Sequence, residues 1–439
     1  MKNKQLVQPY ERKVIYFDEI TEKDVFSKLI NLEQLTFELT DACNLKCKYC
    51  GYGEFYTTHD KRENRFMDFN IAKRIIDYLF EIWRKHPGKA SIRKIIIGFY
   101  GGEPLLNMNL IFQIIGYIET LPPVPHTIFE YNMTTNAILL DKYMEYLYQK
   151  KITLLLSLDG DKYAHSYRID HSNHNSFDKA FKNIKLLMTT YPDYFNKYVN
   201  FNSVLHDRNN VKAIREFIKK EFNKIAQISE LNQFGVYPNR ENEFKTMFHS
   251  IKSDINTSDP DFENMFPDKM GLFRFVSEMA GNYFYLHNFL IKKKINKIPP
   301  TGTCLPFEKK IFITVNGKIL PCEKIDQKYT LGYVKDNGVE LDLRKVAQIY
   351  SAYYKKIMKL CVNCYMKPFC SQCMFYMYDL DGCTKCPSFA NKQDIINYIN
   401  YYSKILHEHP DLYKKSLMKC YLSYEYKKSI YNRLLLNIL

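Results

Sequence analysis

The strongest constraint on the fold is an alternation, from Leu35 to about Ile228, of short apolar runs with longer segments of helical periodicity. Such alternation is typical of repeated βα units, in which right-handed helical crossovers join parallel strands. It predicts a parallel sheet, closed or partly closed into a barrel, with functional residues at the carboxyl ends of its strands. The expected strands are residues 34–40, 94–99, 127–133, 152–157, 198–205 and 227–233, and the expected helices are 69–83, 105–120, 140–148, 176–190 and 210–222.

The chain divides by composition into five expected segments. A bridging region with one amphipathic helix around residues 269–287 ends at the Pro299-Pro300 pair. We predict an α/β fold: a partial (β/α)6 TIM-like barrel, then a cysteine-rich module with a β-hairpin turning at Gly317, then a helical C-terminal tail. The segments are an N-terminal segment (1–33), the barrel (34–235), the bridging region (236–300), the cysteine-rich module (301–388) and the tail (389–439).

Cysteine is distributed unevenly along the 439 residues. Of twelve cysteines, three lie between Cys43 and Cys50, eight between Cys304 and Cys386, and Cys420 stands alone. The N-terminus lacks the apolar core of a signal peptide and no run of 18 apolar residues occurs, so we expect a cytoplasmic protein without membrane contact. In a reducing compartment, clustered cysteines favour metal ligation over disulfides.

The first cluster has the pattern C-x3-C-x2-C and follows the first expected strand directly. Its members, Cys43, Cys47 and Cys50, could hold three corners of a cubane iron–sulfur cluster and leave one iron open for a ligand. A structural zinc site would need a fourth ligand, for which His59 is the nearby candidate. The spacing alone leaves both metals open and favours the cluster.

This motif, with Tyr49 before its last cysteine, resembles the signature of the radical SAM superfamily. Further matches follow in order at successive strand ends. The resemblance implies that a GGEP element after the second strand meets the amino group of the SAM methionine, and two glycines with an acid suit that role. The element is made of Gly101, Gly102, Glu103 and Pro104.

Three later motifs extend the resemblance. Asn136 lies in a Thr-Asn-Ala turn similar to the family's TNG turn, and Ser157 begins a Ser-Leu-Asp-Gly turn similar to its SxDG turn. The resemblance implies that Ser157 and Arg168 meet the SAM carboxylate, since a guanidinium binds a carboxylate as a fork. The usual HDxxR pattern is one residue shorter here, His165-Ser-Tyr-Arg168, and lacks its Asp. Leu205 lies on the fifth strand, where the family packs the adenine.

The second cysteine group resembles the SPASM extension of radical SAM peptide-modifying enzymes, which holds two auxiliary [4Fe–4S] clusters. In the family, three residues separate the fifth and sixth cysteines of this module, but only two separate Cys370 and Cys373 here. A cysteine that some sulfatase maturases have just before the first cysteine of the module is missing. The auxiliary cluster nearer the active site, called the near cluster, would then bind a spare cysteine or have an open iron. Two zinc ribbons are the alternative structure for the whole module. The resemblance assigns Cys304, Cys322 and Cys373 to the near cluster, and Cys361, Cys364, Cys370 and one of Cys383 or Cys386 to the distal one.

Two further residues have open interpretations. Glu323 follows Cys322, where related sulfatase maturases have an aspartate that accepts the substrate proton. A general base and an ordinary loop acid are both consistent with the sequence, and Asp326 is a neighbouring alternative. We expect Cys420 to be a plain thiol.

The resemblance implies an oxidoreductase that cleaves SAM reductively to methionine and a 5′-deoxyadenosyl radical, using three [4Fe–4S] clusters. The main hypothesis is a maturase that installs a thioether or carbon–carbon crosslink in a ribosomally made precursor peptide. The alternative is an anaerobic sulfatase maturase that forms formylglycine from Cys or Ser. The implied partners are the peptide and a flavodoxin or ferredoxin-type electron donor. Only 42 residues precede Cys43, so leader recognition would use the basic tail, another surface or a separate leader-binding protein.

Two other classes compete with an enzyme. A non-catalytic iron–sulfur electron carrier would leave the GGEP element and Arg168 without a role. A zinc-ribbon protein that binds nucleic acid is suggested by the net charge of +15. Its Lys and Arg residues are spread along the whole chain, however, so we expect no nucleic-acid partner.

Overall fold

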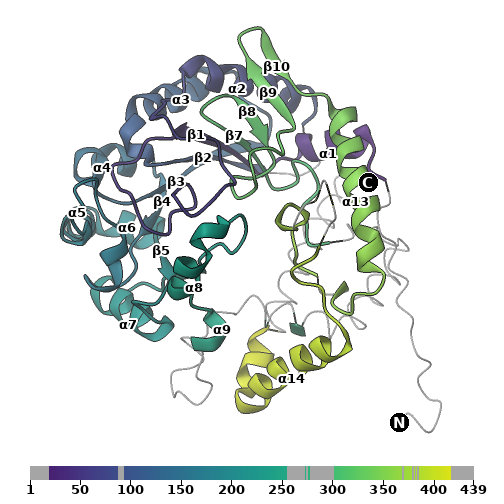
Figure 1. The fold of residues 1–439 in the computed structure, drawn as a ribbon. Coiled ribbons are helices and arrows are strands. Elements are labelled where there is room, and N and C mark those ends of the chain that lie inside the picture. Colours follow the sequence, from purple (N-terminus) through teal and green to yellow (C-terminus); the bar gives the residue numbers. More distant parts are fainter. Residues whose placement is uncertain are drawn as a thin grey trace.

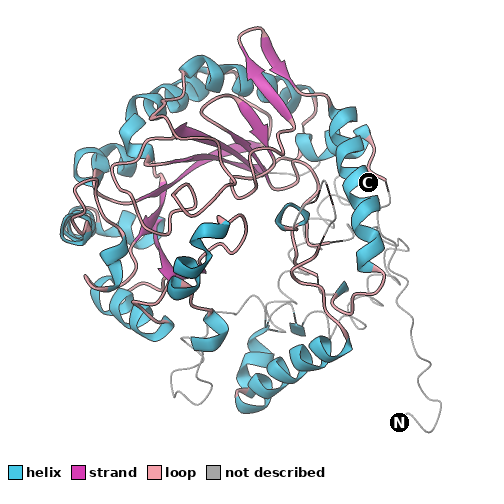
Figure 2. Cartoon of the chain, viewed as in Figure 1, coloured by secondary structure: helices cyan, strands magenta, loops and turns pink. Residues whose placement is uncertain are grey.

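The computed structural model describes residues 19–87, 93–254, 272, 275–276, 301–367, 370–377, 380, 382 and 385–416. Within these residues a single ten-stranded sheet has the order β10-β9-β8-β7-β1-β2-β3-β4-β5-β6 (Figures 1 and 2). The parallel strands are β1 (Gln34–Thr40), β2 (Arg93–Gly101), β3 (Thr127–Thr135), β4 (Thr153–Ser157), β5 (Val199–Leu205) and β6 (Gln227–Glu230). The predicted α/β fold with a six-stranded partial barrel is confirmed.

Helices cover the convex side of the parallel strands and form the outer arc in Figure 1. Apolar side chains that alternate along β1, such as Phe37, join those of α2 in one core. The expected helix at 105–120 divides in two, because Pro104 begins a 3-10 turn, η2 (Pro104–Asn107), before α3. The helices are α2 (Phe69–Lys85), α3 (Met108–Thr120), α4 (Leu140–Gln149), α5 (Phe177–Thr190), α6 (Pro192–Tyr198) and α7 (Val211–Phe222).

The concave side of the sheet is polar. A Cβ atom at Gly98 would meet the side chains of Gln34, Thr36 and Asn132, so these residues share the inner face. A cavity of about 310 Å³ lies against this face and extends to Gln227 on β6. Closed (β/α)8 barrels fill their interior with branched apolar side chains. Here the partial barrel keeps a polar lumen instead.

The cysteine-rich module continues the same sheet. β7 (Lys310–Ile313) pairs in parallel with β1, and β8 (Lys318–Leu320), β9 (Gly332–Lys335) and β10 (Gly338–Glu340) follow as antiparallel strands. The predicted hairpin is confirmed, with Gly317 in its turn at φ +77°. The sheet therefore runs across the expected boundary at residue 301.

Two packed helices were not expected from the sequence. α13 (Leu343–Cys361) lies against α1 (Glu22–Ile30), and the Ile20 backbone N–H donates to Ser351 Oγ over 2.8 Å. The buried residues of α13 recur with helical spacing, as in Val346, Tyr350 and Tyr354. This helical spacing is a sequence signal that could have predicted α13. It lies within residues 301–388, a segment that was interpreted mainly from its cysteines.

The remaining elements are short or terminal. α8 (Glu241–Met247), α9 (Ile251–Asp254), η3 (Ala164–Tyr167), η4 (Pro238–Arg240) and η6 (Met374–Tyr376) are short helices. α14 (Lys392–Glu408) begins at an Asn391 capping box and represents the predicted helical tail. The helix expected at 269–287, the Pro299-Pro300 boundary and residues 1–17 lie outside the described residues.

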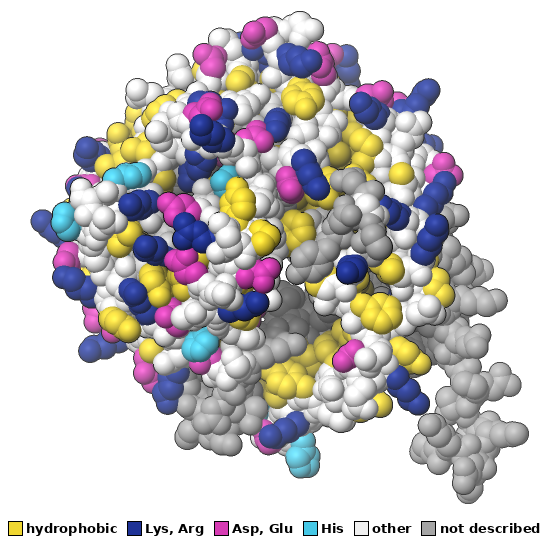
Figure 3. All heavy atoms as spheres, in the orientation of Figure 1, with side chains coloured by type: hydrophobic (Ala, Val, Ile, Leu, Met, Phe, Trp, Pro, Cys, Tyr) yellow, Lys and Arg dark blue, Asp and Glu magenta, His cyan; other side chains and the backbone are white. Residues whose placement is uncertain are grey.

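Basic and acidic side chains alternate over the face shown in Figure 3, with no single basic patch there. In the part of the chain that the structure describes, no helix combines the length and apolarity needed to cross a membrane.

Candidate functional site

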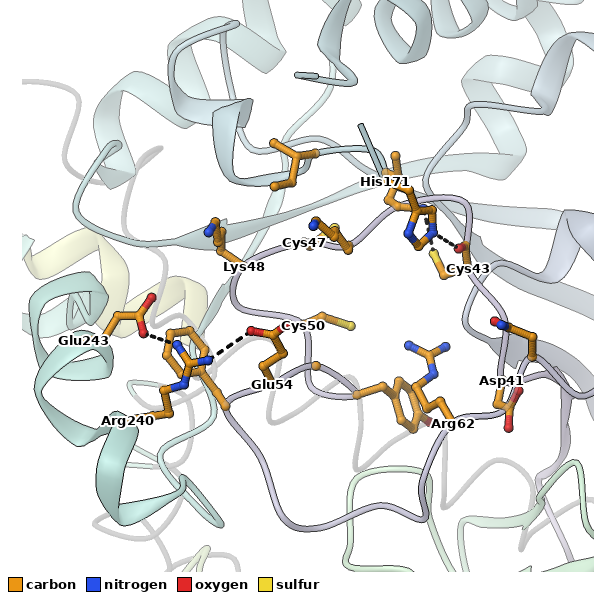
Figure 4. Close-up of a pocket in the computed structure, with 17 residues that line it drawn as sticks. Asp41, Cys43, Cys47, Lys48, Cys50, Glu54, Arg62, His171, Arg240 and Glu243 are labelled. Carbon is orange, nitrogen blue, oxygen red and sulfur yellow. Dashed lines mark hydrogen bonds and ion pairs between the residues drawn. The ribbon is translucent and has the colours of Figure 1, made fainter. Parts of the chain in front are cut away.

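The first cysteine cluster forms a loop at the carboxyl end of β1. Cys43, Cys47 and Cys50 are free thiols, and all three line a cavity of about 390 Å³ (Figure 4). Backbone hydrogen bonds fasten the loop to the segment after β4: Lys46 N–H donates to the Ile169 carbonyl over 2.8 Å, and Lys48 N–H to that of Tyr167 over 3.0 Å. The fold thus brings the three predicted ligands to one cavity.

The charge state of these thiols bears on what the cavity can hold. Burial raises the pKa of both Cys43 and Cys47 to about 12, because each thiolate would lose its water. A cationic inorganic core would supply the missing counter-charge. Among the described residues no three His, Cys, Asp or Glu side chains are placed to hold a single metal ion. Three thiols around a cavity of this size suit a polynuclear cluster.

The GGEP element lies against the end of β1. Gly101 has φ +129°, which L side chains rarely adopt. A Cβ at Gly102 would collide with the Ala42 carbonyl and the Arg62 guanidinium. The Gly102 and Glu103 N–H groups donate to β1-side carbonyls over 2.9 and 3.0 Å. Both glycines are therefore needed for this close approach.

Glu103 is a buried carboxylate between three motifs. It accepts hydrogen bonds from Thr135 Oγ1 (2.7 Å), Asn136 N–H (2.9 Å) and Leu105 N–H (3.1 Å). Burial raises its pKa to about 7 although these donors act in the opposite direction. A ligand ammonium would provide the positive charge that this carboxylate lacks.

Asn136 joins the third strand to the cysteine loop. Its amide Nδ2 donates to Asn44 Oδ1 over 2.7 Å and lies 3.8 Å from Cys43 Sγ. Ala137 follows with φ +65°, the left-handed conformation that glycine adopts at no cost in the similar TNG turn.

The predicted residues of the fourth and fifth strands lie at neighbouring strand ends. Ser157 ends β4 in register with Asn202 of β5, and Leu205 ends β5 fully buried. Tyr49 reaches this side from the cysteine loop. Its ring stacks on His206 at 5.5 Å, and its hydroxyl donates to Asp159.

Arg168 differs from expectation in the partner of its guanidinium. Nε and Nη2 donate to the two oxygens of Asp159 over 2.9 and 3.1 Å, and both side chains are buried. Burial alone would raise the pKa of Asp159, but Arg168 outweighs it and holds that pKa below its usual value. The edge expected to meet the SAM carboxylate is thus occupied.

Asp159 lies in the SxDG-like turn of the sequence analysis, which gave its carboxylate no role. It also accepts from Val204 N–H over 2.9 Å and so ties the turn after β4 to β5. Asp-Gly after a strand is an ordinary turn signal, so the sequence carried no separate indication of a buried ion pair.

Glu323 lies in the polar lumen and is paired. Lys310 Nζ contacts its two carboxylate oxygens at 2.8 and 3.0 Å, and both residues line the 310 Å³ cavity. Burial by itself would raise the pKa of Glu323. The ammonium of Lys310 has the opposite effect and outweighs burial, so the pKa of Glu323 lies below its ordinary value. Cys322 Sγ is 3.5 Å from Glu323 Oε2. Asp326 instead accepts a local bond from Lys328 N–H.

The later cysteines form two sets by their mutual electrostatic influence. After burial, the largest cause, the pKa of Cys361 is raised to about 12 by other thiols of its set. Cys383 and Cys420 lie outside the described residues. One set is Cys361, Cys364, Cys370 and Cys386. The other set is Cys304, Cys322 and Cys373. Cys304 raises the pKa of Cys373, and all three thiols add to the larger effect of burial in raising the pKa of Tyr350.

Comparisons with known proteins fit this arrangement. The family model of the radical SAM superfamily matches residues 37–220. The radical SAM cyclopropyl synthase TigE of Paramaledivibacter caminithermalis is 27% identical over 209 residues, which are 47% of this chain and 41% of that protein. The cysteine-type anaerobic sulfatase-maturating enzyme of Clostridium novyi is 22% identical over 377 residues, which are 82% of this chain and 90% of that enzyme.

A solved structure gives a likeness of fold. Native anSMEcpe with bound AdoMet and a Cp18Cys peptide superposes with a TM-score of 0.54 at 18% identity. The match covers 88% of this chain and 98% of that one, so it extends beyond the barrel into the cysteine-rich module.

Proposed function

We propose that the chain is a SAM-dependent oxidoreductase that modifies a ribosomally made peptide, because the family model of the radical SAM superfamily matches residues 37–220. The observation that carries this proposal is the convergence of Cys43, Cys47 and Cys50 with the GGEP loop at the carboxyl edge of the parallel strands. In this proposal the bound cluster supplies one electron for reductive cleavage of SAM.

The residues of the chain would hold and orient the co-substrate. The buried carboxylate of Glu103 accepts the ammonium, and the glycines let the backbone approach it. Tyr49, Asn136, Ser157 and Leu205 would bound the remaining surface of the site. The polar lumen beside it would admit a peptide backbone, whose amides need hydrogen-bonding partners.

The main candidate reaction is a crosslink within the peptide. Forming a thioether removes one hydrogen atom from carbon, one proton from the thiol and one electron. Glu323 would take the proton, because Lys310 keeps it ionised, and Cys322 beside it would bind the auxiliary cluster that takes the electron. A carbon–carbon crosslink has the same overall balance of two hydrogens lost.

The auxiliary clusters and the partners belong to the same proposal. Two further [4Fe–4S] clusters would use the two cysteine sets, with Cys383 as the spare ligand of the near one. The electron donor would be a flavodoxin or ferredoxin-type protein, and leader recognition would use a separate protein or another surface. We place the reaction in the cytoplasm.

A defined assay tests the reaction class. The reduced, reconstituted protein is incubated with SAM, and 5′-deoxyadenosine is measured by chromatography. We expect its formation to depend on the reductant and to be lost in Cys47→Ala. If no 5′-deoxyadenosine forms in the loaded wild type, the proposed enzyme class is wrong.

The second candidate is formylglycine formation, favoured by similarity to a sulfatase-maturating enzyme over 82% of the chain. Co-expression with a Cys-containing peptide separates the two. A crosslink retains sulfur and loses two hydrogens, whereas formylglycine loses the sulfur and reacts with a hydrazide probe. A hydrazide-reactive product would reject the crosslink.

A further inference from the structure

The three cysteines of the first cluster differ in the hydrogen bonds that their sulfur atoms receive. The Leu45 N–H donates to Cys43 Sγ over 3.4 Å, and the side-chain amide of Asn136 donates to the same sulfur over 3.8 Å. Sulfur is a large and weak acceptor, so its hydrogen bonds are longer than those to oxygen. Within the part of the chain that the structure describes, no hydrogen bond reaches Sγ of Cys47 or Cys50. The donors therefore gather at one of the three cysteines.

The carboxamide of Asn136 is held in place by its other hydrogen bonds. Its Oδ1 accepts from the Ile138 N–H over 3.0 Å, which fixes which end of the carboxamide is oxygen and which is nitrogen. Its Nδ2 donates to Asn44 Oδ1 over 2.7 Å. An amide nitrogen carries two hydrogens, so the second hydrogen remains for Cys43 Sγ. Asn136 is only 8% exposed, and the fold thus presents one of its donors to the sulfur without help from water.

A donor at a cluster sulfur has a known physical effect. A [4Fe–4S] cluster gains one electron on reduction, and its thiolate sulfurs then become more negative. A hydrogen bond to such a sulfur stabilises the reduced form more than the oxidised form, and proteins set reduction potentials partly in this way. Leu45 donates through its backbone, so that donor does not depend on the side chain. Asn136 donates through its side chain, so the identity of this residue decides whether the second donor exists.

We propose that Asn136 makes the cluster of Cys43, Cys47 and Cys50 easier to reduce, by donating a hydrogen bond from its side-chain amide to the Cys43 thiolate. This inference rests on the proposed function, in which these three cysteines hold a [4Fe–4S] cluster. It gives the Asn136 side chain a role that is separate from contact with SAM. Asn136 acts through Cys43 and is a positioning residue. A residue that only shaped its own turn would leave the reduction potential unchanged.

The test measures the midpoint potential of this cluster in the reconstituted full-length chain without SAM. The potential is poised with titanium(III) citrate and redox dyes, and the electron paramagnetic resonance signal of the reduced cluster is recorded. Subtracting the spectrum of Cys47→Ala, which retains only the auxiliary clusters, isolates the signal of the first cluster. Because no SAM is added, the result is independent of turnover.

Two variants remove the donor, and a third serves as the control. In Asn136→Leu the ratio of reduced to oxidised cluster at a fixed potential should fall about tenfold, which is about 59 mV for a one-electron couple. Asn136→Ser keeps an oxygen for the Ile138 N–H but has no amide, so we expect a similar shift. His171 Nε2 lies 2.8 Å from the carbonyl oxygen of Cys43, not from its sulfur. His171→Ala should therefore leave the potential unchanged.

Several outcomes would overturn the inference. An unchanged potential in Asn136→Leu and Asn136→Ser would leave Asn136 with a role in its turn only. A shift in Asn136→Leu without one in Asn136→Ser would assign the effect to the contact with Ile138, and an equal shift in His171→Ala would assign it to any disturbance around Cys43. Iron content checks loading, and Asn136→Ser carries the test if Asn136→Leu loads poorly. A wild type whose signal equals that of Cys47→Ala would overturn the proposed function instead.

Discussion

Asp159 and Arg168 form a buried ion pair at the site, with 0% and 9% of their side chains exposed. A buried charge that loses its partner is strongly destabilised. We expect Asp159→Ala to lower the free energy of unfolding by about 3–5 kcal/mol, measured by denaturant titration. The matched control is Asp178→Ala, whose pair with Lys162 is 69% and 61% exposed and should contribute less than about 1 kcal/mol. Similar losses in the two variants would contradict this view of Asp159.

Glu323 is the residue whose role the function depends on most directly. A carboxylate that accepts the substrate proton is needed after SAM cleavage, not before it. Glu323→Gln should therefore slow formation of the peptide product by about 10²–10⁴-fold while 5′-deoxyadenosine continues to form. The ratio of the two products, measured by mass spectrometry, checks this expectation. Asp326→Asn is the control, and an unchanged ratio in Glu323→Gln would assign Glu323 a structural role with Lys310.

At the level of elements, the junction of β1 with the β7–β8 hairpin contains a buried acid. Glu38 accepts from Val315 N–H over 2.9 Å, and burial raises its pKa from 4.5 to about 7. The folded chain therefore holds this proton more tightly than the unfolded chain. The contribution to stability is complete below about pH 4.5 and is lost as the pH rises through about 7.

Glu38→Gln should remove this pH dependence while keeping an acceptor for Val315. Between pH 5 and pH 8 we expect the wild type to lose up to about 3 kcal/mol more than the variant, measured by denaturant titration. Glu33→Gln is the control, since Glu33 forms an exposed pair with Lys309 and should leave the slope as it is. Parallel slopes for wild type and Glu38→Gln would contradict the prediction.

The two cysteine sets make a prediction about elements that are far apart in sequence. Cys361→Ala and Cys386→Ala should each lose about four irons per chain, and the double variant should lose no more, because both residues belong to one set. Combining Cys373→Ala with Cys386→Ala should lose about eight. Iron analysis of the reconstituted proteins measures this, with Cys420→Ala as the control. A loss of eight irons from the first pair would place Cys386 with the near cluster.

For the whole molecule, the continuous sheet makes the cysteine-rich module part of the barrel core. β7 covers the edge of β1, a strand whose residues from Leu35 onward are all buried. A chain ended at residue 300 would expose this edge, so we expect it to aggregate in size-exclusion chromatography. A chain ended at residue 390 loses α14, which packs on a separate cluster around Phe275, and should remain monodisperse. A monodisperse 1–300 fragment would show that the barrel folds alone.

Much of the site followed from the sequence because each motif is local. The parallel strands, the cysteine loop and the GGEP element each depend on a few adjacent residues, and parallel strands place their carboxyl ends at one edge. The radical SAM resemblance rested on such local motifs, and the match of residues 37–220 agrees with it. Helices α1 and α13 were not predicted, although α13 has a helical period, and the sequence could not show that they pack on each other, because the contact joins Ile20 and Ser351, which are 331 residues apart.

What the sequence by itself determined is the order of the βα units and the residue types at their ends, since spacing and periodicity encode both. Only the tertiary structure decided which charges meet. It pairs Arg168 with Asp159 and Glu323 with Lys310. The physical reason is that the strength of a salt bridge depends on the distance between its two charges and on their burial. A local sequence motif determines neither quantity for residues that are far apart in the chain.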